Sequence, residues 1–460
     1  MARETEARQR YKAVGKRLPR PDAAAKVIGK TVYAADLHLP RMLHAKLLAS
    51  PYAHARILRI DASRARAAAG VEAVLTAADL PPIVNRNPSN RHHVPLAQDE
   101  VLFYGQPVAA VLASDPHVAE EALELIEVEY EELPAVLDPM EAMKEGAPPA
   151  RSPVHDVDRS EEKAHASVDV AQKESEGKGS NVSAQMTFRR GDVEQALAEA
   201  DTVVEGTWKT GMVHQGYIEP QATIADYDVS GELTIWSSTQ GPFWVRDDVS
   251  SALGIPESKV RVIVTEVGGG FGGKILLTQL LVSSLAMAVR RPVKLILSRK
   301  EDLLAGNPAP QAVVELKTGM KKDGTLTALK ARVIYDSGAF PAAPMLPGCF
   351  TIGGYYRCPN FEIRGFEVLT NKVSVGALRA PGAPQVTFAL ENQMDMMARN
   401  LGLDPLEVRL KNAVGPGDTL PSGHPYPSIG LRECLERIAE TDIWRERDKV
   451  KERGEHRGVG

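Results

Sequence analysis

The segment GGGFGGK, residues 268–274, lies between a β-rich run at 259–266 and an apolar run at 275–289. Glycines in such number permit positive φ angles and let a backbone approach a ligand closely. Amide groups at the start of a following helix favour an anion such as a phosphate group. We therefore predict a strand, a ligand-binding glycine loop and a buried helix that begins near residue 275.

Short apolar and β-branched runs alternate with helical patterns on both sides of this loop, which predicts a mixed α/β fold. The predicted strands cover residues 41–48, 57–60, 71–75, 108–112, 202–209, 223–227, 233–237, 259–266, 293–298, 313–317, 327–335 and 361–369. The predicted helices cover residues 62–69, 117–127, 193–200, 275–289 and 384–400.

Composition divides the 460-residue chain into four regions. We expect an N-terminal arm at 1–21, an α/β domain at 22–139 and a second folded region at 187–460. Residues 140–186 between them hold few large apolar side chains and many charges, so they cannot bury much surface. That segment is predicted to be a linker or an excursion over a neighbouring surface.

The overall chemistry of the chain excludes several classes of protein. A net charge of −5 and a pI near 6.2 give no basis for a nucleic-acid surface. The apolar run at 275–289 is too short to span a bilayer, and no secretory leader pattern is visible. The three cysteines lack metal-site spacing and cannot hold an iron–sulfur cluster unaided, so we expect a reducing, cytoplasmic compartment and no protein metal ligands.

Two further segments carry chemistry-bearing residues. Gln240 follows a predicted strand within Thr-Gln-Gly-Pro at 239–242, where an ordinary turn residue is the alternative interpretation. Arg379 stands alone in the small, turn-forming stretch at 376–382. An arginine there offers a rigid fork of donors to a phosphate, carboxylate or oxo group, and a salt bridge to a nearby carboxylate is the alternative.

A nucleotide-binding P-loop is the first alternative for the glycine segment, because Gly268, Gly273 and Lys274 match its G-x-x-x-x-G-K core. Ile275 occupies the position where such loops need a Ser or Thr to ligate magnesium, which disfavours an NTPase. A turn that serves only tight packing is the second alternative.

The three segments together resemble the molybdopterin-binding signature of molybdenum hydroxylase large subunits, the xanthine dehydrogenase and aldehyde oxidase family. The matching sequences are Ser-Thr-Gln at 238–240, GGGFGGK at 268–274 and Leu-Arg-Ala-Pro-Gly at 378–382. Flanking matches lie at 29–36, 50–55 and 403–412, so the resemblance extends from about residue 15 to 460.

This resemblance implies a fold and a site. Residues 22–139 would form the family's α/β hammerhead domain, and 187–460 the first of its two molybdopterin-binding domains, the second being absent. The cofactor would be molybdenum–molybdopterin, either plain or in the cytosine dinucleotide form, with the metal held by pterin sulfurs. The residues expected to bind it are Gln240, Gly269, Gly270, Phe271, Gly272 and Arg379.

The resemblance also implies a reaction, the oxidation of an aldehyde, aromatic or N-heterocyclic substrate with water as the oxygen source. Electrons would pass to iron–sulfur clusters and FAD on partner chains. The family's catalytic glutamate lies in a C-terminal motif that this sequence lacks, so no catalytic residue is assigned and the chain is expected to be inactive alone. A separate polypeptide would carry the second molybdopterin domain if the gene is split.

Two departures bear on the substrate. Purine-oxidising members carry a glutamate where this chain has Ile275, and copper-containing carbon monoxide dehydrogenases carry a cysteine where it has Ala380. A large subunit like that of hydroxybenzoyl-CoA reductase and a non-catalytic scaffold half remain as alternatives.

Overall fold

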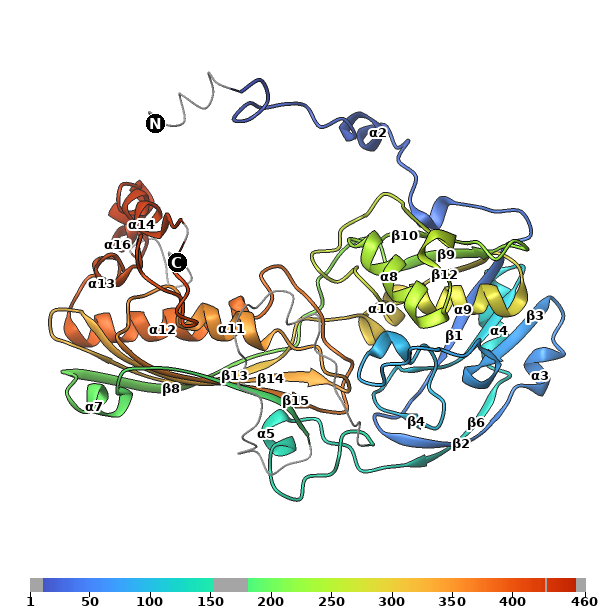
Figure 1. Ribbon diagram of the computed structural model, residues 1–460, viewed down its shortest axis with the longest axis horizontal. Coiled ribbons are helices and arrows are strands. Elements are labelled where there is room, and N and C mark those ends of the chain that lie inside the picture. Colours follow the sequence, from blue (N-terminus) through green and yellow to red (C-terminus); the bar gives the residue numbers. More distant parts are fainter. Residues whose placement is uncertain (1–10, 153–180, 427, 452–460) are drawn as a thin grey trace.

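The computed structural model describes residues 11–152, 181–426 and 428–451. Its strands form sheets of seven, five and three strands. Two lobes lie side by side, one built on the seven- and three-stranded sheets and the other on the five-stranded sheet (Figure 1). No helix within the described ranges is long and apolar enough to cross a membrane.

The seven-stranded sheet joins strands from distant parts of the sequence in the order β11-β10-β9-β12-β1-β5-β3. These strands are β1 (Leu43–Ala49), β3 (Val71–Thr76), β5 (Pro107–Ala113), β9 (Ala222–Tyr227), β10 (Leu233–Ser237), β11 (Val260–Val264) and β12 (Val293–Ile296). Strand β1 runs parallel to β12, with Leu43 opposite Val293. The regions 22–139 and 187–460, which composition separates, therefore share one sheet.

The helices that pack on this sheet have apolar faces and clear signals at their ends. Helix α9 (Gln279–Val289) is apolar on nearly every side and is buried, as expected for such a helix. Helix α8 (Pro242–Leu253) starts at a proline and ends before Gly254, which has a left-handed φ of 66°. Helix α4 (Pro116–Leu123) is capped by Asp115.

The three-stranded sheet has the order β4-β2-β6 and completes this lobe. Its strands are β4 (Glu100–Val101), β2 (Ala55–Asp61) and β6 (Glu127–Glu132). The helix predicted at 117–127 ends four residues early, because the chain turns at 124–126 to enter β6. The helix predicted at 62–69 is the single turn α3 (Ser63–Arg66).

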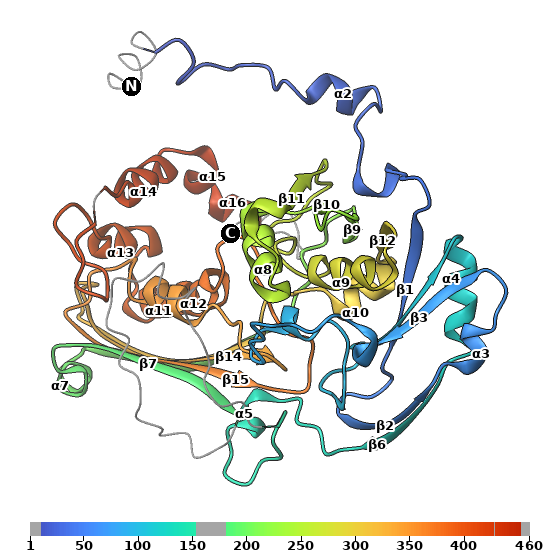
Figure 2. The ribbon, with the colours of Figure 1, turned by 45° about the vertical axis from the view of Figure 1, so that its right-hand side comes forward.

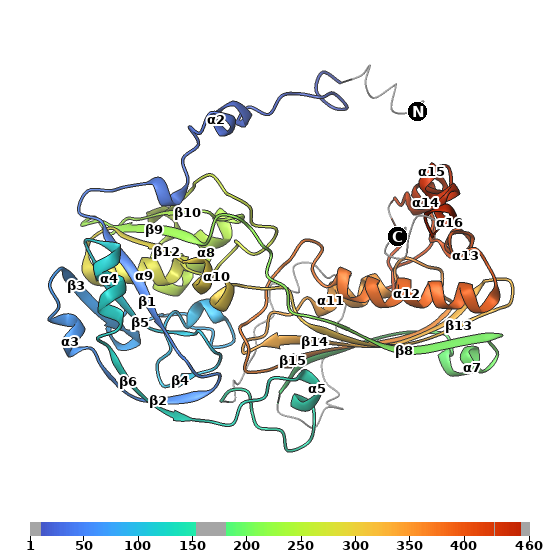
Figure 3. The same cartoon turned by 180° about the vertical axis from the view of Figure 1, so that it is seen from behind.

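The five-stranded sheet forms the second lobe in the order β7-β15-β14-β13-β8. Its strands are β7 (Val182–Arg190), β8 (Thr202–Thr210), β13 (Ala312–Met320), β14 (Leu326–Gly338) and β15 (Asn360–Leu369). Helices α11 (Met345–Ile352) and α12 (Ala383–Leu401) cover one face, and α5 (Pro139–Ala142) lies on the other (Figure 3). Strand β7 starts inside the predicted linker because its residues pair with β15.

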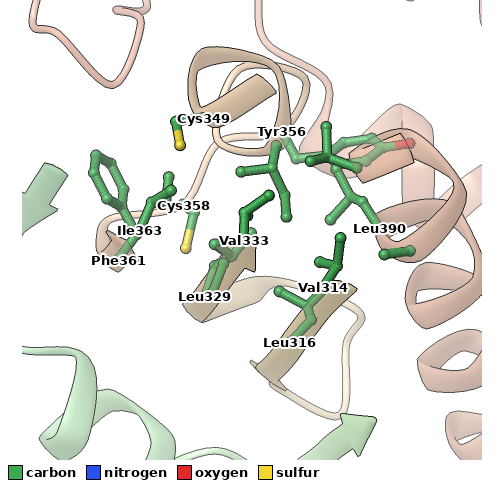
Figure 4. Close-up of a cluster of buried hydrophobic side chains, with 14 of the residues drawn as sticks. Val314, Leu316, Leu329, Val333, Cys349, Tyr356, Cys358, Phe361, Ile363 and Leu390 are labelled. Atoms are coloured by element: carbon green, nitrogen blue, oxygen red, sulfur yellow. The ribbon is translucent and has the colours of Figure 1, made fainter. Parts of the chain in front are cut away.

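The core of the second lobe lies between this sheet and helices α11 and α12 (Figure 4). Val314, Leu316 and Val333 point from the strands toward Leu390 of α12. Cys349 and Cys358 lie in the same core, and burial raises the pKa of both thiols to about 12.

The remaining helices are short. They are α2 (Ala23–Val27), α7 (Val193–Ala198), α10 (Arg299–Ala305), α13 (Pro405–Asn412), α14 (Leu431–Ala439), α15 (Asp442–Arg445), α16 (Arg447–Lys451) and the 3₁₀ turns η1 (Ala34–Asp36), η2 (Ala77–Asp79), η3 (Arg91–His93) and η4 (Glu257–Lys259). Residues 11–27 extend outward from the first lobe (Figure 2), and Lys26 of α2 keeps an ion pair with Glu266 at 2.6 Å. Residues 11–20 of the predicted arm are exposed.

Candidate functional site

The glycine loop at 268–274 follows β11, but it does not lead directly into a helix. The prediction of a helix from residue 275 is wrong by four residues, since α9 begins at Gln279. Side chains form hydrogen bonds to the backbone between residues 275 and 278, which is therefore not helical. The Thr239 hydroxyl donates to the Ile275 carbonyl at 2.9 Å, and the Gln279 amide oxygen accepts from Leu277 N at 2.8 Å. The loop therefore presents its own amides rather than those of a helix N-terminus.

Phe271 sits at the tip of the loop in a left-handed conformation, with φ 53°. Such a conformation is uncommon for a bulky residue and costs roughly 1–2 kcal/mol. Gly269 and Gly272 on either side have φ values of 93° and 107°. The tight turn is closed by Gly273 N, which donates to Gly270 O at 2.8 Å. This backbone holds the Phe271 side chain outward, 43% exposed.

Gln240, which follows β10, is hydrogen-bonded to the loop through both its backbone and its side chain. Its backbone N donates to Lys274 O at 2.6 Å, and its Oε1 accepts from Gly272 N at 2.9 Å. A Cβ at Gly270 would lie 2.4 Å from that oxygen, so only glycine leaves room for the amide. With Oε1 held by the loop, the Nε2 donors of Gln240 have no acceptor within the described part of the chain.

Arg379 reaches the same loop from a third segment. Its backbone N donates to Phe271 O at 2.8 Å, and its guanidinium carbon lies 5.7 Å from the Phe271 ring centre. The alternative of a salt bridge is not what the structure shows: among the described residues no carboxylate pairs with this guanidinium. Arg379 is exposed, so its donors are available to a ligand.

The structure thus brings all six predicted residues together on one loop and its two neighbours. Gly269 and Gly270 form the inner part of the turn, Phe271 the tip, and Gln240 and Arg379 approach it from separate segments. Gly272 allows close approach of the Arg379 segment, because a Cβ there would lie 2.5 Å from Ala377 O. Their roles in binding a cofactor remain predictions.

Lys274, the last residue of the loop, points into the protein. Its side chain is 0% exposed, and its ammonium lies 2.6 Å from Glu219 Oε2 and 4.9 Å from the centre of the Tyr217 ring. Burial lowers the pKa of Lys274, and the Glu219 carboxylate opposes that shift. A P-loop lysine must reach phosphates on the outer side of its loop, so this geometry argues against a P-loop.

The platform beneath the loop is formed by residues that the sequence analysis did not single out. Gln215, Tyr217, Glu219 and Gln221 alternate along one segment and all lie at 11% exposure or less. Gln221 Nε2 donates to Gly273 O at 2.8 Å. Gln215 Nε2 donates at 2.8 Å to Ala377 O, in the Arg379 segment. Polar or aromatic residues at every second position were the signal that could have identified this platform.

A pocket of about 180 Å³ lies beside the Arg379 segment. Its lining is mostly apolar and includes Val213, Ala309, Leu378 and Pro381. Neither here nor elsewhere in the described ranges do three or more His, Cys, Asp or Glu side chains gather as a metal site would require. The site offers the backbone amides of the loop, the side-chain amide of Gln240 and the guanidinium of Arg379. These donors suit an organic cofactor rich in oxygen and nitrogen.

Comparison with known proteins agrees with this geometry. The family described as "Molybdopterin cofactor-binding domain" matches residues 174–413. The family described as "Aldehyde oxidase and xanthine dehydrogenase, a/b hammerhead domain" matches residues 28–134. The chain belongs to the molybdenum hydroxylase large subunits. The predicted family and fold class, a hammerhead domain followed by a molybdopterin-binding domain, are confirmed.

Relatives of this hydroxylase subunit differ in length. The nicotinate dehydrogenase large molybdopterin subunit of Eubacterium barkeri is 34% identical over 94% of this chain and 97% of its own. The xanthine dehydrogenase molybdenum-binding subunit of Escherichia coli O157:H7 is also 34% identical, over 93% of this chain but 56% of its own. The chain therefore spans nearly all of the first relative and about half of the second.

Solved structures give the same result. Aldehyde oxidoreductase from Desulfovibrio gigas superimposes with a TM-score of 0.84 at 30% identity, covering 95% of this chain and 47% of that one. Quinoline 2-oxidoreductase from Pseudomonas putida 86 gives a TM-score of 0.83 at 31% identity, covering 97% and 56%. The homologues are molybdenum-dependent oxidoreductases.

Proposed function

We propose that this chain holds a molybdenum–molybdopterin cofactor against the outer side of the glycine loop. It would form part of an enzyme that oxidises an aldehyde, aromatic or N-heterocyclic substrate with water as the oxygen source. One observation carries the proposal: the free donors of Gln240 and Arg379 converge on the loop around Phe271. Three segments that lie far apart in the sequence build one donor-rich surface.

Each part of this surface has a distinct task. Gln240, oriented by its bond to Gly272 N, directs its Nε2 donors outward to an oxygen or nitrogen acceptor. Arg379 supplies a planar fork for an anionic group of the cofactor. The cofactor, when bound, supplies the metal-centred oxidation chemistry and takes up electrons from the substrate. The task of this chain is to position that group.

The substrate class is supported by the surroundings of the loop. The pocket beside Arg379 is lined by apolar side chains such as Leu378 and Pro381, which suits a flat, weakly polar ring. Ile275 follows the loop, where it offers no polar group to a purine. Two of the relatives are named for the N-heterocycles nicotinate and quinoline. An aldehyde, an aromatic compound or an N-heterocycle less polar than a purine is therefore the preferred substrate.

Partner chains complete the proposed enzyme. Iron–sulfur clusters and FAD would lie on separate subunits, since the two cysteines in the core and the exposed Cys434 make no cluster site here. If the gene is split, a separate polypeptide would carry the other molybdopterin domain; the nicotinate dehydrogenase large molybdopterin subunit, 97% of which this chain covers, supports such an arrangement. The cofactor would be the plain or the cytosine dinucleotide form, and the assembly would be cytoplasmic.

Metal and pterin analysis tests this proposal. The chain is purified alone and after co-expression with its genomic neighbours, and molybdenum and oxidised pterin fluorescence are measured. We expect stoichiometric molybdenum and pterin with the neighbours, and a clear loss of both in Gln240→Ala. The control is Arg246→Gln, which breaks the ion pairs of a partly exposed α8 side chain with Asp247 and Glu257. Absence of molybdenum in every combination would overturn the proposal.

A further inference from the structure

We propose that Glu219 is a positioning residue, which sets the cofactor-facing shape of the glycine loop by binding its first and last residues from beneath. The inference rests on the proposed function, because it concerns how the same loop is prepared for its ligand. Glu219 lies on the inner side of the loop, so it would act through the loop backbone and not by touching the cofactor.

The contacts of Glu219 span the whole loop. Its Oε2 accepts from Gly268 N at 2.7 Å and from the Lys274 ammonium at 2.6 Å. Its own backbone N donates to Gly268 O at 3.1 Å, so Glu219 and Gly268 are bonded in both directions. One carboxylate therefore joins residues 268 and 274, the two ends between which the left-handed tip at Phe271 is held.

Packing reinforces this arrangement. A Cβ at Gly268 would lie 2.5 Å from the Cβ of Glu219, and one at Gly273 would lie 2.7 Å from the amide carbon of Gln215. Both glycines are thus needed for the loop to sit directly on the platform. Because these contacts hold the inner side of the loop, we expect the loop to be ordered before a ligand arrives, so that binding need not provide the free energy of ordering it.

The charges explain why the pair is sensitive to change. The Lys274 side chain is 0% exposed, and Glu219 is its only carboxylate partner among the described residues. A buried charge that loses its partner is strongly destabilising, whereas a complete pair contributes little net stability. The Glu219–Lys274 pair therefore contributes by fixing one conformation of the loop. Removal of Glu219 should increase the mobility of the loop more than that of the lobe built on the five-stranded sheet.

Amide hydrogen exchange and cofactor content together test the inference. Glu219→Ala, Glu219→Gln and Glu219→Ala/Lys274→Met are made in the full chain, co-expressed with its genomic neighbours. Exchange is followed in peptides that cover residues 266–276, with and without the neighbours. The double variant removes the stranded ammonium, so the loop can be measured even where Glu219→Ala alone does not fold.

We expect loop amides to exchange about tenfold faster or more in both alanine variants, the factor implied by losing a bond to a charged group. Molybdenum and pterin content should fall in parallel. Glu219→Gln keeps an oxygen that can accept from Gly268 N but removes the counter-charge of the Lys274 ammonium, so it should restore part of the protection and of the cofactor content. A role that depended on the charge alone would not produce this partial rescue.

The control is Glu391→Gln, which breaks the half-buried pair with Arg409 between α12 and α13. It should leave loop exchange and cofactor content unchanged. Equal loop exchange in wild type and the alanine variants, or a released loop with full cofactor content, would overturn the inference. If the wild-type assembly holds no molybdenum, the proposed function fails, and the exchange data alone still decide whether Glu219 positions the loop.

Discussion

At the scale of single residues, the site depends on the absence of a side chain as much as on the donors. Gly270 is buried beneath Gln240, and a methyl group there would meet the amide oxygen at 2.4 Å. That distance is far inside van der Waals contact, so the Gln240 side chain would have to leave the loop. Its donors would then lose the direction that its bond to Gly272 N provides.

Gly270→Ala is therefore expected to abolish most cofactor binding while costing only about 1–3 kcal/mol of folding free energy, the range for a lost buried hydrogen bond. Pterin content and thermal unfolding measure the two effects. Gly430→Ala is a matched control, since the nearest atom to its added Cβ lies 3.9 Å away. Unaltered pterin content in Gly270→Ala would contradict the role assigned to the hydrogen bond between Gln240 and the loop.

Arg379→Lys tests the geometry of the second donor group. Lysine keeps the charge but loses the planar fork, and the two side chains are not interchangeable at a bidentate site. We expect cofactor affinity to fall by about tenfold or more, the effect of losing one charge-assisted bond. Equilibrium dialysis of pterin from the assembled protein measures the change. Affinity equal to wild type would mean that Arg379 acts only as a point charge.

The sequence predicts some of these residues and not others for a physical reason. Gln240, Phe271 and Arg379 lie in recognisable local motifs, so their meeting was expected. Glu219 and Gln221 lie in no such motif, and their importance arises only when the chain folds back beneath the loop. A carboxylate 55 residues from its lysine partner cannot be paired with it from spacing alone.

At the scale of elements, α12 shows how one helix carries both the second lobe and the site. It begins directly after Gly382, at the end of the Arg379 segment, and Leu390 and Met394 on its inner face are 0% exposed. Gln393 on the same face donates to Val204 O and Leu316 O, which tie the helix to β8 and β13. Loosening the helix should therefore weaken the lobe.

Met394→Ala is expected to lower the free energy of unfolding by about 2–5 kcal/mol, because it leaves a cavity between α12 and the sheet. Met396→Ala in the same helix should change it by less than about 0.5 kcal/mol, since that side chain is 39% exposed. Chemical denaturation of the two variants gives the comparison. Similar losses in both would contradict the packing described for α12.

The elements that were predicted well have their signals within a few residues. Helix α12 matches the prediction of 384–400 within one residue at each end, because left-handed Gly382 and Gly402 flank it. Helix α8 was not predicted, although Val245, Val249 and Leu253 have helical spacing, because exposed Phe243 and Trp244 obscure that face. The start of α9 was wrong because side-chain bonds to its preceding turn are tertiary.

At the scale of the whole molecule, the shared sheet limits how the chain can be divided. Leu43 and Leu47 of β1 pack in the same core as Leu285 of α9 and Leu295 of β12. Composition suggests a boundary near residue 139, but strand pairing over such separations has no local signature in a single sequence. The order of the two domains was predictable from the family resemblance, and the sheet that they share was not.

The fragment 22–139 should consequently fail to fold alone. Without β12, strand β1 exposes an unpaired edge, and its inward leucines lose most of the buried side chains of their core, which lie at 225–297. Circular dichroism and gel filtration should report an aggregated or unfolded chain. Co-expression with residues 181–460 should restore a soluble complex. A cooperative, monomeric unfolding transition of the isolated fragment would contradict this prediction and support an autonomous domain.

The pairing of β1 with β12 also determines when, during synthesis of the chain, the seven-stranded sheet can form. Leu43 and Val293 are 250 residues apart, and ribosomes add roughly 5–20 residues per second, so β1 waits about 12–50 s for its neighbour to be made. Throughout that interval its free edge is open to other nascent chains. The glycine loop, encoded just before β12, is translated at the end of this wait, and its cofactor-facing surface is complete only after Arg379, which comes later than β12 in the sequence, has also been made.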